Sequence, residues 1–220
     1  MNSAELQKDR AEALQLVPVS RETAARLDEF AILLLRWQKA VQLVAPSTLP
    51  KLWTRHIADS LQIVEFAPGA KRWIDLGSGG GFPGLVVAIA LAKTPDAIVH
   101  LVESDTRKAA FLREAVRISG APAKVHHERV ESAAERFARS VDIVTARALA
   151  PLARLLELTA PLLSGGARGV FLKGQDVDNE LTQAAKSWNI SAETFPSRTD
   201  PRGRILIIER AVRQNVAGQH

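Results

Sequence analysis

A glycine-rich stretch, WIDLGSGGGFPG at residues 73–84, has the spacing that most directly indicates chemistry in this sequence. Asp75 stands two residues before the turn GSGGG (77–81), and Pro83 stands two residues after that turn. Glycines such as Gly77 and Gly79 let a ligand approach the backbone with no side chain in the way, while Asp75 can orient the turn or bind a polar group. The stretch therefore predicts a site for a nucleotide-like cofactor, and the alternative is a tight turn that only permits close packing.

Glu103 is the second residue whose place indicates a cofactor. It ends the apolar run IVHLVES, where an acidic side chain can accept hydrogen bonds from both ribose hydroxyls; a solvated strand end is the alternative. The stretch from Asp75 to Gly81 has the form D-x-G-x-G-x-G, whereas Gly79 to Gly84 satisfies the G-x-G-x-x-G spacing of dinucleotide sites. These features favour S-adenosylmethionine, which carries a ribose and no pyrophosphate, and NAD is the competitor.

The elements that must position these residues follow from the apolar pattern after residue 69. Short apolar runs alternate with helical stretches, which is typical of a doubly wound α/β domain with a mostly parallel, Rossmann-like sheet. The glycine turn then lies between a strand and a helix that begins near Pro83, where a missing N–H costs nothing. The six predicted strands are RWIDL (72–76), IVHLVES (98–104), AKVHHE (123–128), VDIVTAR (141–147), GVFLKG (169–174) and RILIIER (204–210).

The first 68 residues have a helical pattern instead. Leu27, Phe30, Ala31 and Leu34 fall at helical spacing, with Trp37, Val41 and Val44 continuing the same stripe. The segment APSTLP at 45–50 is expected to break this helix, and a second helix is expected over 51–66. We therefore expect a helical region at 1–68 packed on the core, a cofactor-binding domain at 69–213 and a flexible tail at 214–220.

Composition limits the classes of function. The chain has 220 residues, 46% of them hydrophobic, a net charge of +5 and no cysteine. The missing cysteines exclude disulfides, thiolate zinc sites and cysteine nucleophiles. No run reaches the roughly 20 apolar residues of a membrane span, and the N-terminus is charged where a signal peptide is apolar, so a cytoplasmic protein is expected. The basic excess, which lies in the later half, is compatible with a polyanionic partner.

Motifs spread over about residues 20–210 give the sequence a specific resemblance. In their order and separations they are similar to the bacterial 16S ribosomal RNA guanine-N7 methyltransferase family, also known as glucose-inhibited division protein B. Gln38 and Gln42 stand where that family commonly has asparagines, and PRGRILII replaces a family segment that usually contains Glu-Arg-His. The matching motifs are WQKAVQLVA (37–45), RHIADSL (55–61), DLGSGGGFPG (75–84), RKAAFLREA (107–115), RVES (129–132), ARALAPL (146–152) and FLKG (171–174).

The resemblance implies a cytoplasmic enzyme of the class I methyltransferase fold. It implies S-adenosylmethionine as cofactor, and small-subunit ribosomal RNA, a 30S particle or an assembly intermediate as partner, with no metal and no membrane. We expect a monomer. An NAD-dependent oxidoreductase and a non-catalytic ribosome-assembly factor are the alternatives. The expected cofactor contacts, with Glu103 holding the ribose, are Asp75, Gly77, Gly79, Phe82, Glu103, Val130, Glu131 and Arg147.

The implied reaction needs little acid–base machinery. Guanine N7 presents a lone pair on the major-groove edge of the base, and a sulfonium is a built-in leaving group, so alignment is the enzyme's main task. Methylation of an exocyclic amine usually requires an Asn/Asp-Pro-Pro-Tyr turn after the fourth strand. Here that turn reads ARALAPL, and the chain contains no tyrosine.

Two arginines are the candidate residues for positioning the substrate. Methylated N7 makes the purine cationic, so an arginine directed at N7 would oppose the reaction. Arg147 and Arg204, the latter aligned with the family's arginine, are therefore expected to hold phosphate or guanine O6 alone. The alternative for Arg147 is a strand-end arginine paired with an acid such as Glu131.

His56 and Lys173 are the remaining candidates for RNA contact. His56 either faces the cofactor cleft or RNA, or is a packed histidine, and Arg55 four residues before Asp59 suggests a simple helical ion pair. Lys173 follows the fifth predicted strand, so it either contacts RNA phosphate or lies in a solvated turn. The adjacent residues 126 and 127 are both histidines, which a strand directs to opposite faces, so they form no metal pair.

Overall fold

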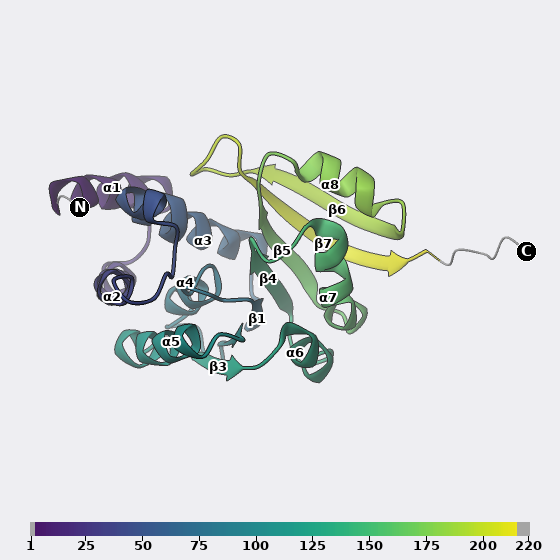
Figure 1. The fold of residues 1–220 in the computed structure, drawn as a ribbon, viewed down its shortest axis with the longest axis horizontal. Helices are drawn as coiled ribbons and strands as arrows, with labels where there is room; N and C mark the ends of the chain where they lie inside the picture. The colour runs from purple at the N-terminus through teal and green to yellow at the C-terminus, as the bar shows by residue number, and fades with distance from the viewer. Residues whose placement is uncertain (1–2, 215–220) are drawn as a thin grey trace, which may run out of the picture.

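The computed structural model describes residues 3–214 and shows a seven-stranded sheet in the order β3-β2-β1-β4-β5-β7-β6 (Figure 1). The first five strands are parallel, and β7 runs antiparallel to both β5 and β6. The α/β, mostly parallel sheet predicted from the sequence is confirmed. The strands are β1 (Arg72–Leu76), β2 (Ile98–Glu103), β3 (Ala123–His127), β4 (Ile143–Arg147), β5 (Arg168–Lys173), β6 (Trp188–Pro196) and β7 (Arg204–Arg213).

Strand β6 is the one that the sequence pattern does not predict. It lies at the sheet edge, paired only with β7, and most of its residues are exposed or half-buried. Its sequence, WNISAETFP, includes polar residues and ends in a proline, which an edge strand tolerates because one side of its backbone needs no partner. An edge strand lacks the continuous apolar run by which the buried strands are found.

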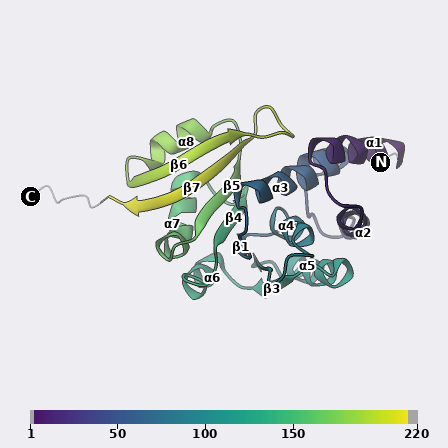
Figure 2. The same ribbon diagram turned by 180° about the vertical axis from the view of Figure 1, so that it is seen from behind.

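Helices cover both faces of the sheet (Figures 1 and 2). Those on one face, together with the N-terminal helices, share one apolar cluster that contains Phe30, Val87 and Phe111. Those on the other face pack around Leu156 and Ala133 in a second cluster. The helices are α1 (Ser3–Leu16), α2 (Arg21–Trp37), α3 (Asp59–Leu61), α4 (Gly84–Ala90), α5 (Thr106–Ser119), α6 (Val130–Arg136), α7 (Leu152–Ser164) and α8 (Val177–Ala184).

Helix α2 buries the predicted stripe but ends earlier than predicted. Leu27 and Leu34 are fully buried against the core, whereas the helix stops at Trp37 and does not continue to Val44. The cause is Gln38, whose Oε1 accepts hydrogen bonds from the N–H groups of Leu43 (2.9 Å) and Val44 (3.1 Å). This side chain supplies the turn with the partners that a continuing helix would have supplied.

Residues 51–66 also differ from the regular helix that is predicted after the break at 45–50. A 3₁₀ segment (Pro46–Lys51) leads into a π-helical segment (Trp53–Ala58), then α3, then a second 3₁₀ segment (Gln62–Phe66). Asp9 of α1 accepts a hydrogen bond from the N–H of Trp53 at 2.7 Å, which satisfies a donor at the start of the π-helical segment. This long-range cap cannot be read from the local pattern.

The C-terminal end of the described chain is anchored. Gln214, which the sequence places in a flexible tail, donates its backbone N–H to the carbonyl of Ser187 at 2.9 Å. The rest of the predicted tail, 215–220, lies outside the described residues. Within residues 3–214, none of the helices combines the length and the apolar character needed to span a bilayer.

Candidate functional site

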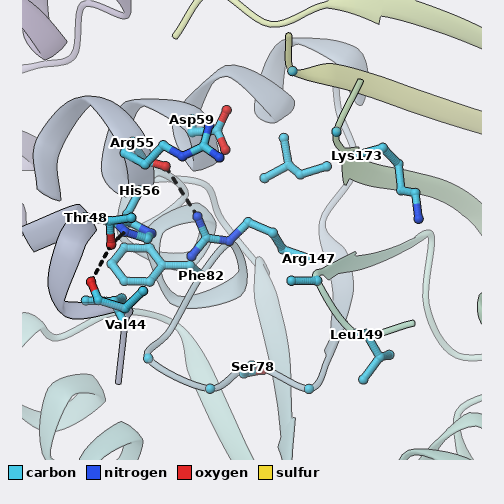
Figure 3. A pocket seen from close by; sticks show the side chains of 18 of the residues that line it. Val44, Thr48, Arg55, His56, Asp59, Ser78, Phe82, Arg147, Leu149 and Lys173 are labelled. Atoms are coloured by element: carbon cyan, nitrogen blue, oxygen red, sulfur yellow. Dashed lines mark hydrogen bonds between the residues drawn. The ribbon is translucent and has the colours of Figure 1, made fainter. Parts of the chain in front are cut away.

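A cavity of about 1010 Å³ opens where β1, β4 and β5 end (Figure 3). Its wall is built from the glycine loop, the π-helical segment, the loop after β4 and the start of β7. It is at the upper end of the size range of small-molecule sites, about 300–1,000 Å³. Most of the candidate residues come together here, namely Gly77, Gly79, Phe82, His56, Arg147, Lys173 and Arg204.

The glycine loop requires glycines for steric reasons. Gly77 and Gly79 have φ angles of 70° and 52°, in the left-handed region that side chains disfavour. A Cβ on Gly77 would lie 2.8 Å from the Leu149 side chain, and one on Gly80 would lie 2.9 Å from the carbonyl oxygen of Leu43. The neighbouring loops thus approach the glycine loop closely, and the loop presents mainly backbone to the cavity.

Asp75 lies beneath the loop and does not line the cavity. Its Oδ2 accepts a hydrogen bond from the N–H of Gly84 at 3.1 Å, and its Oδ1 accepts one from the Thr145 hydroxyl at 2.9 Å. Burial raises its pKa to about 6. Of the two roles that the sequence allows, the geometry shows the first, in which Asp75 orients the turn and the start of α4.

Glu103 holds the same loop from the end of β2. Its Oε2 accepts a hydrogen bond from the N–H of Gly79, and its Oε1 accepts one from the N–H of Asp105, both at 2.8 Å. With 8% of its surface exposed, Glu103 is not a solvated strand end, so that alternative is wrong. A carboxylate has about four acceptor positions, so two of them are left for a ligand.

Arg147 lies across the middle of the cavity. Its guanidinium is 5.0 Å from the centroid of the Phe82 ring, and Nη1 donates a hydrogen bond to the carbonyl of Arg55 at 3.4 Å (Figure 3). Burial lowers the pKa of Arg147, whereas Asp59 and Asp75 raise it. The arginine thus lies within electrostatic reach of both carboxylates.

The alternative prediction, in which Arg147 pairs with Glu131, is wrong. Glu131 pairs with Arg154 at 3.1 Å and lies 3.8 Å from Arg129. Glu131 and its neighbour Val130 begin α6, and neither is among the residues that line the cavity. Val130 packs against the apolar cluster of that face. Their role as cofactor contacts stays a prediction.

His56 both lines the cavity and packs tightly. Its Nε2 lies 2.8 Å from the Thr48 hydroxyl, and its ring centroid is 5.1 Å from that of Phe82. Nδ1 is buried without a hydrogen-bond partner in the described part of the chain. Burial lowers its pKa to about 3, with Arg147 and Arg55 adding to the effect, so the ring is neutral at neutral pH.

The helical ion pair expected between Arg55 and Asp59 does not form. Arg55 pairs with Asp200 instead. Asp59 accepts hydrogen bonds at Oδ1 from Gln62 (2.8 Å), Ser197 (3.2 Å) and Thr199 (2.8 Å). Asp59 lines the cavity, although sequence reasoning does not place it among the site residues. Two of its partners, Ser197 and Thr199, lie on the connection from β6 to β7, which follows the strand that the sequence pattern misses.

Lys173 and Arg204 face each other across the β5–β7 pair. Lys173 forms a 2.6 Å ion pair with Glu180, and its side chain is only 10% exposed, so the solvated-turn alternative is wrong. Arg204 donates from Nη1 to the carbonyls of Pro201 (3.0 Å) and Gly203 (2.8 Å). Both cations line the end of the cavity opposite the glycine loop.

Lys108 and Leu149 are among the other residues that line the cavity and that sequence reasoning did not single out. Lys108 reaches it from the first turn of α5, and Leu149 reaches it from the loop after β4. Both belong to motifs of the noted resemblance, RKAAFLREA and ARALAPL, which is the signal that could have identified them. They add one cation and one apolar wall to the site.

Solved structures with this fold include two methyltransferases. An O-methyltransferase from Bacillus cereus, in complex with SAH, matches with a TM-score of 0.61 over 96% of this chain and 100% of its own, at 13% identity. A ribosomal protein L11 methylase from Lactobacillus delbrueckii subsp. bulgaricus matches with a TM-score of 0.52 over 71% of this chain and 78% of its own, at 18% identity. The Rossmann-like class I methyltransferase fold is thereby confirmed.

Sequence relatives are much closer. A protein named Ribosomal RNA small subunit methyltransferase G from Bradyrhizobium sp. strain BTAi1 is 56% identical over 207 residues, which cover 94% of this chain and 93% of its own. A protein of the same name from Bradyrhizobium diazoefficiens is 59% identical over 191 residues, 87% of this chain and 74% of its own. The family model described as rRNA small subunit methyltransferase G matches residues 23–202. This chain therefore belongs to the rRNA small subunit methyltransferase G family.

Proposed function

We propose that this protein transfers a methyl group from S-adenosylmethionine to N7 of one guanine in small-subunit ribosomal RNA. The observation that carries the proposal is the 56% identity, over 94% of the chain, to a relative named for small-subunit ribosomal RNA methylation. The comparisons offer no support for an NAD-dependent oxidoreductase or a non-catalytic assembly factor. The proposed setting is the cytoplasm, with free RNA, a 30S particle or an assembly intermediate as substrate, and a monomeric enzyme.

The residues of the glycine loop fit such a cofactor. Gly77, Gly79 and Gly80 line the cavity with backbone only, and the two free acceptor positions of Glu103 suit a pair of ribose hydroxyls behind the loop. When bound, S-adenosylmethionine supplies the activated methyl group and the leaving group. Asp75 holds the turn and the start of α4 in place beneath it.

The protein's contribution to the reaction is alignment. The cavity is large enough for a cofactor and a base together, and its central side chains, Arg147 and His56, are held by fixed contacts. Holding the nucleophile in line with a methyl group is a proximity effect. In well-oriented model reactions this effect lowers the activation barrier by about 7–11 kcal/mol. The neutral ring of His56 adds no positive charge near a base that becomes cationic.

The opposite end of the cavity suits a polyanion. Lys173 and Arg204 line it, Arg147 and Arg55 lie further along the cavity, and Lys108 reaches the cavity from α5, so cations are spread along a space that also admits a base. Cations of this kind bind RNA phosphates, and an arginine can bind phosphate or guanine O6. We therefore assign Arg147 and Arg204 to RNA positioning.

The experiment that tests the function is methyl transfer. Protein and S-adenosylmethionine with a radiolabelled methyl group are incubated with small-subunit RNA and with particles from cells lacking this gene, and the nucleosides are then analysed. Label in 7-methylguanosine is expected. Tight cofactor binding without label in that nucleoside would contradict the proposal and indicate another methyl acceptor.

Arg147→Ala tests whether Arg147 binds RNA or the cofactor. The variant is expected to weaken RNA binding, measured with S-adenosylhomocysteine bound, because the cation in the middle of the cavity is lost. If the variant lost cofactor affinity and kept normal RNA affinity, Arg147 would be a cofactor residue and the RNA assignment would be wrong.

A further inference from the structure

The carboxylate of Asp59, a residue that lines the cavity, has one oxygen held by the protein and one without a hydrogen bond among residues 3–214. All three hydrogen bonds found for it among residues 3–214, from Gln62, Ser197 and Thr199, end on Oδ1. None of them uses Oδ2. The side chain is 9% exposed and lines the cavity, where Figure 3 shows it beside Arg55 and near Arg147. Three donors thus fix the orientation of a carboxylate whose second oxygen is left to accept hydrogen bonds.

The charges around Asp59 do not fully compensate its burial. Arg55 forms its ion pair with Asp200, and both Arg55 and Arg147 act on Asp59 through charge, with no hydrogen bond to its carboxylate in the described residues. Burial is the largest influence on the carboxylate and raises its pKa. A buried carboxylate gains most from a ligand that brings hydrogen-bond donors.

The side chains follow a defined order along the cavity. Figure 3 shows the Arg147 guanidinium between Asp59 and the glycine loop at Ser78. The edge of guanine has a matching order, namely the 2-amino group, N1–H, O6 and N7. The first two are donors, and the last two are acceptors. A carboxylate, then an arginine, then the cofactor loop is the complementary sequence of groups.

We propose that Asp59 binds the Watson–Crick edge of the target guanine, with the two lone pairs of Oδ2 accepting hydrogen bonds from N1–H and the 2-amino group. This inference rests on the proposed function and names its specificity residue. The guanine O6 then lies on the side of Arg147, and N7 faces the glycine loop. Adenine has no 2-amino group and an acceptor at N1, so the same carboxylate rejects it.

Inosine, which lacks only the 2-amino group, tests the contact directly. Small-subunit RNA is assembled by splinted ligation with guanine or inosine at the methylated position, and kcat/KM is measured for both. The wild type is expected to lose about tenfold to a hundredfold on inosine, because a hydrogen bond to a charged group is lost. Asp59→Asn keeps the shape of the side chain and the oxygen that accepts from Ser197 and Thr199. This variant is expected to methylate the RNA with guanine slowly, and its kcat/KM is expected to differ less than twofold between the two RNAs.

Thr199→Val is the matched control, because it removes a donor to Oδ1 and leaves Oδ2 unchanged. It is expected to keep the wild-type ratio between guanine and inosine, whatever its overall rate. The proposal is overturned if the wild type methylates both RNAs equally. It is also overturned if Asp59→Asn is slower on both RNAs by the same factor, because Asp59 then acts only as an anchor for the connection from β6 to β7.

A binding measurement separates this proposal from the proposed function. Calorimetry with the protein saturated with S-adenosylhomocysteine compares GMP with IMP, for the wild type and for Asp59→Asn. A preference for GMP that Asp59→Asn abolishes, in a protein that forms no 7-methylguanosine, would contradict the proposed function and support the guanine contact. Equal affinities of the wild type for the two nucleotides would overturn the contact even if methyl transfer succeeds.

Discussion

Individual residues in this protein divide between those that shape the site and those that face a ligand. Asp75 and Glu103 each accept a hydrogen bond from a backbone N–H in or just after the glycine loop, whereas Asp59 and Arg147 line the cavity itself. The first pair keeps the glycine loop in a conformation that only glycines adopt easily. The second pair lies where a base would enter. This division makes separate predictions possible for cofactor and RNA.

Gly77→Ala tests the shape of the loop. Its φ of 70° and a Cβ position 2.8 Å from Leu149 disfavour any side chain. We expect weaker binding of S-adenosylmethionine by calorimetry, and a loss of about 1–2 kcal/mol in the free energy of unfolding. Gly174→Ala, at a glycine with no atom within 4 Å of its Cβ position, is the control. Equal effects of the two substitutions on unfolding would show that the loop tolerates a side chain.

His56 gives a prediction for pH dependence. Burial lowers its pKa from 6.5 to about 3, so the unfolded chain takes up a proton at a higher pH than the folded chain does. The stability that the neutral ring contributes is therefore present above pH 6.5 and is lost as pH falls toward 3. Between neutral pH and about pH 4 we expect protonation linked to His56 to lower the wild type's free energy of unfolding by about 3 kcal/mol. Chemical denaturation of the wild type and His56→Gln at several pH values measures it; parallel curves would contradict the assignment.

At the scale of elements, the segment 38–44 links α2 to the site. Leu43 and Val44 line the cavity, and the carbonyl of Leu43 abuts the glycine loop. Gln38 holds this segment through both ends of its amide, since Nε2 also donates to the carbonyl of Val44 at 2.9 Å. The N-terminal helices therefore contribute directly to the wall of the cavity.

Gln38→Ala is expected to loosen this wall. Three hydrogen bonds are lost and two backbone donors lose their partner, so we expect a loss of about 1–3 kcal/mol in the free energy of unfolding. Cofactor affinity should fall as well, because the glycine loop loses a neighbour. Gln42→Ala, at an exposed glutamine of the same segment, is the control. If both variants match the wild type in calorimetry and denaturation, the segment does not depend on Gln38.

At the scale of the whole molecule, one cavity joins parts that are far apart in the sequence. The glycine loop follows β1, whereas Lys173 and Arg204 come from β5 and β7 in the last quarter of the chain. Under the proposed function, the first end binds the cofactor and the second, which carries Lys173 and Arg204, binds RNA. Because β4 and β5 separate β1 from β7 at this edge of the sheet, a change at one end is expected to leave the other unchanged.

Arg204→Gln tests this separation. RNA binding is expected to weaken, and the slope of log affinity against log salt concentration is expected to decrease by about 1, because one cation–phosphate contact is lost. Affinity for S-adenosylmethionine should stay within twofold of the wild type. Filter binding over a range of salt concentrations and calorimetry provide the two readouts. An unchanged salt slope would show that Arg204 makes no contact with an RNA phosphate.

The sequence by itself determined the class of fold, the bounds of β1, and the glycine loop. These features are local, because a buried strand needs a continuous apolar run and a left-handed turn needs glycine. The resemblance of the motifs also indicated the family that the relatives confirm. The end of α2 and the irregular course of 51–66 could not be predicted, because Gln38 and Asp9 supply backbone partners that no periodicity reveals.

Only the tertiary structure decided which charged groups meet. The sequence pairs Arg55 with Asp59 by helical spacing, whereas Arg55 pairs with Asp200 and Asp59 binds Ser197 and Thr199. These partners follow β6, an edge strand without a continuous apolar run, so its pattern does not predict where the chain returns. Local sequence determines much of the conformation and burial, but the partner of a buried charge depends on which distant segment the fold brings beside it. Here the fold holds one oxygen of Asp59, a residue that lines the cavity, and leaves the other without a hydrogen bond among residues 3–214.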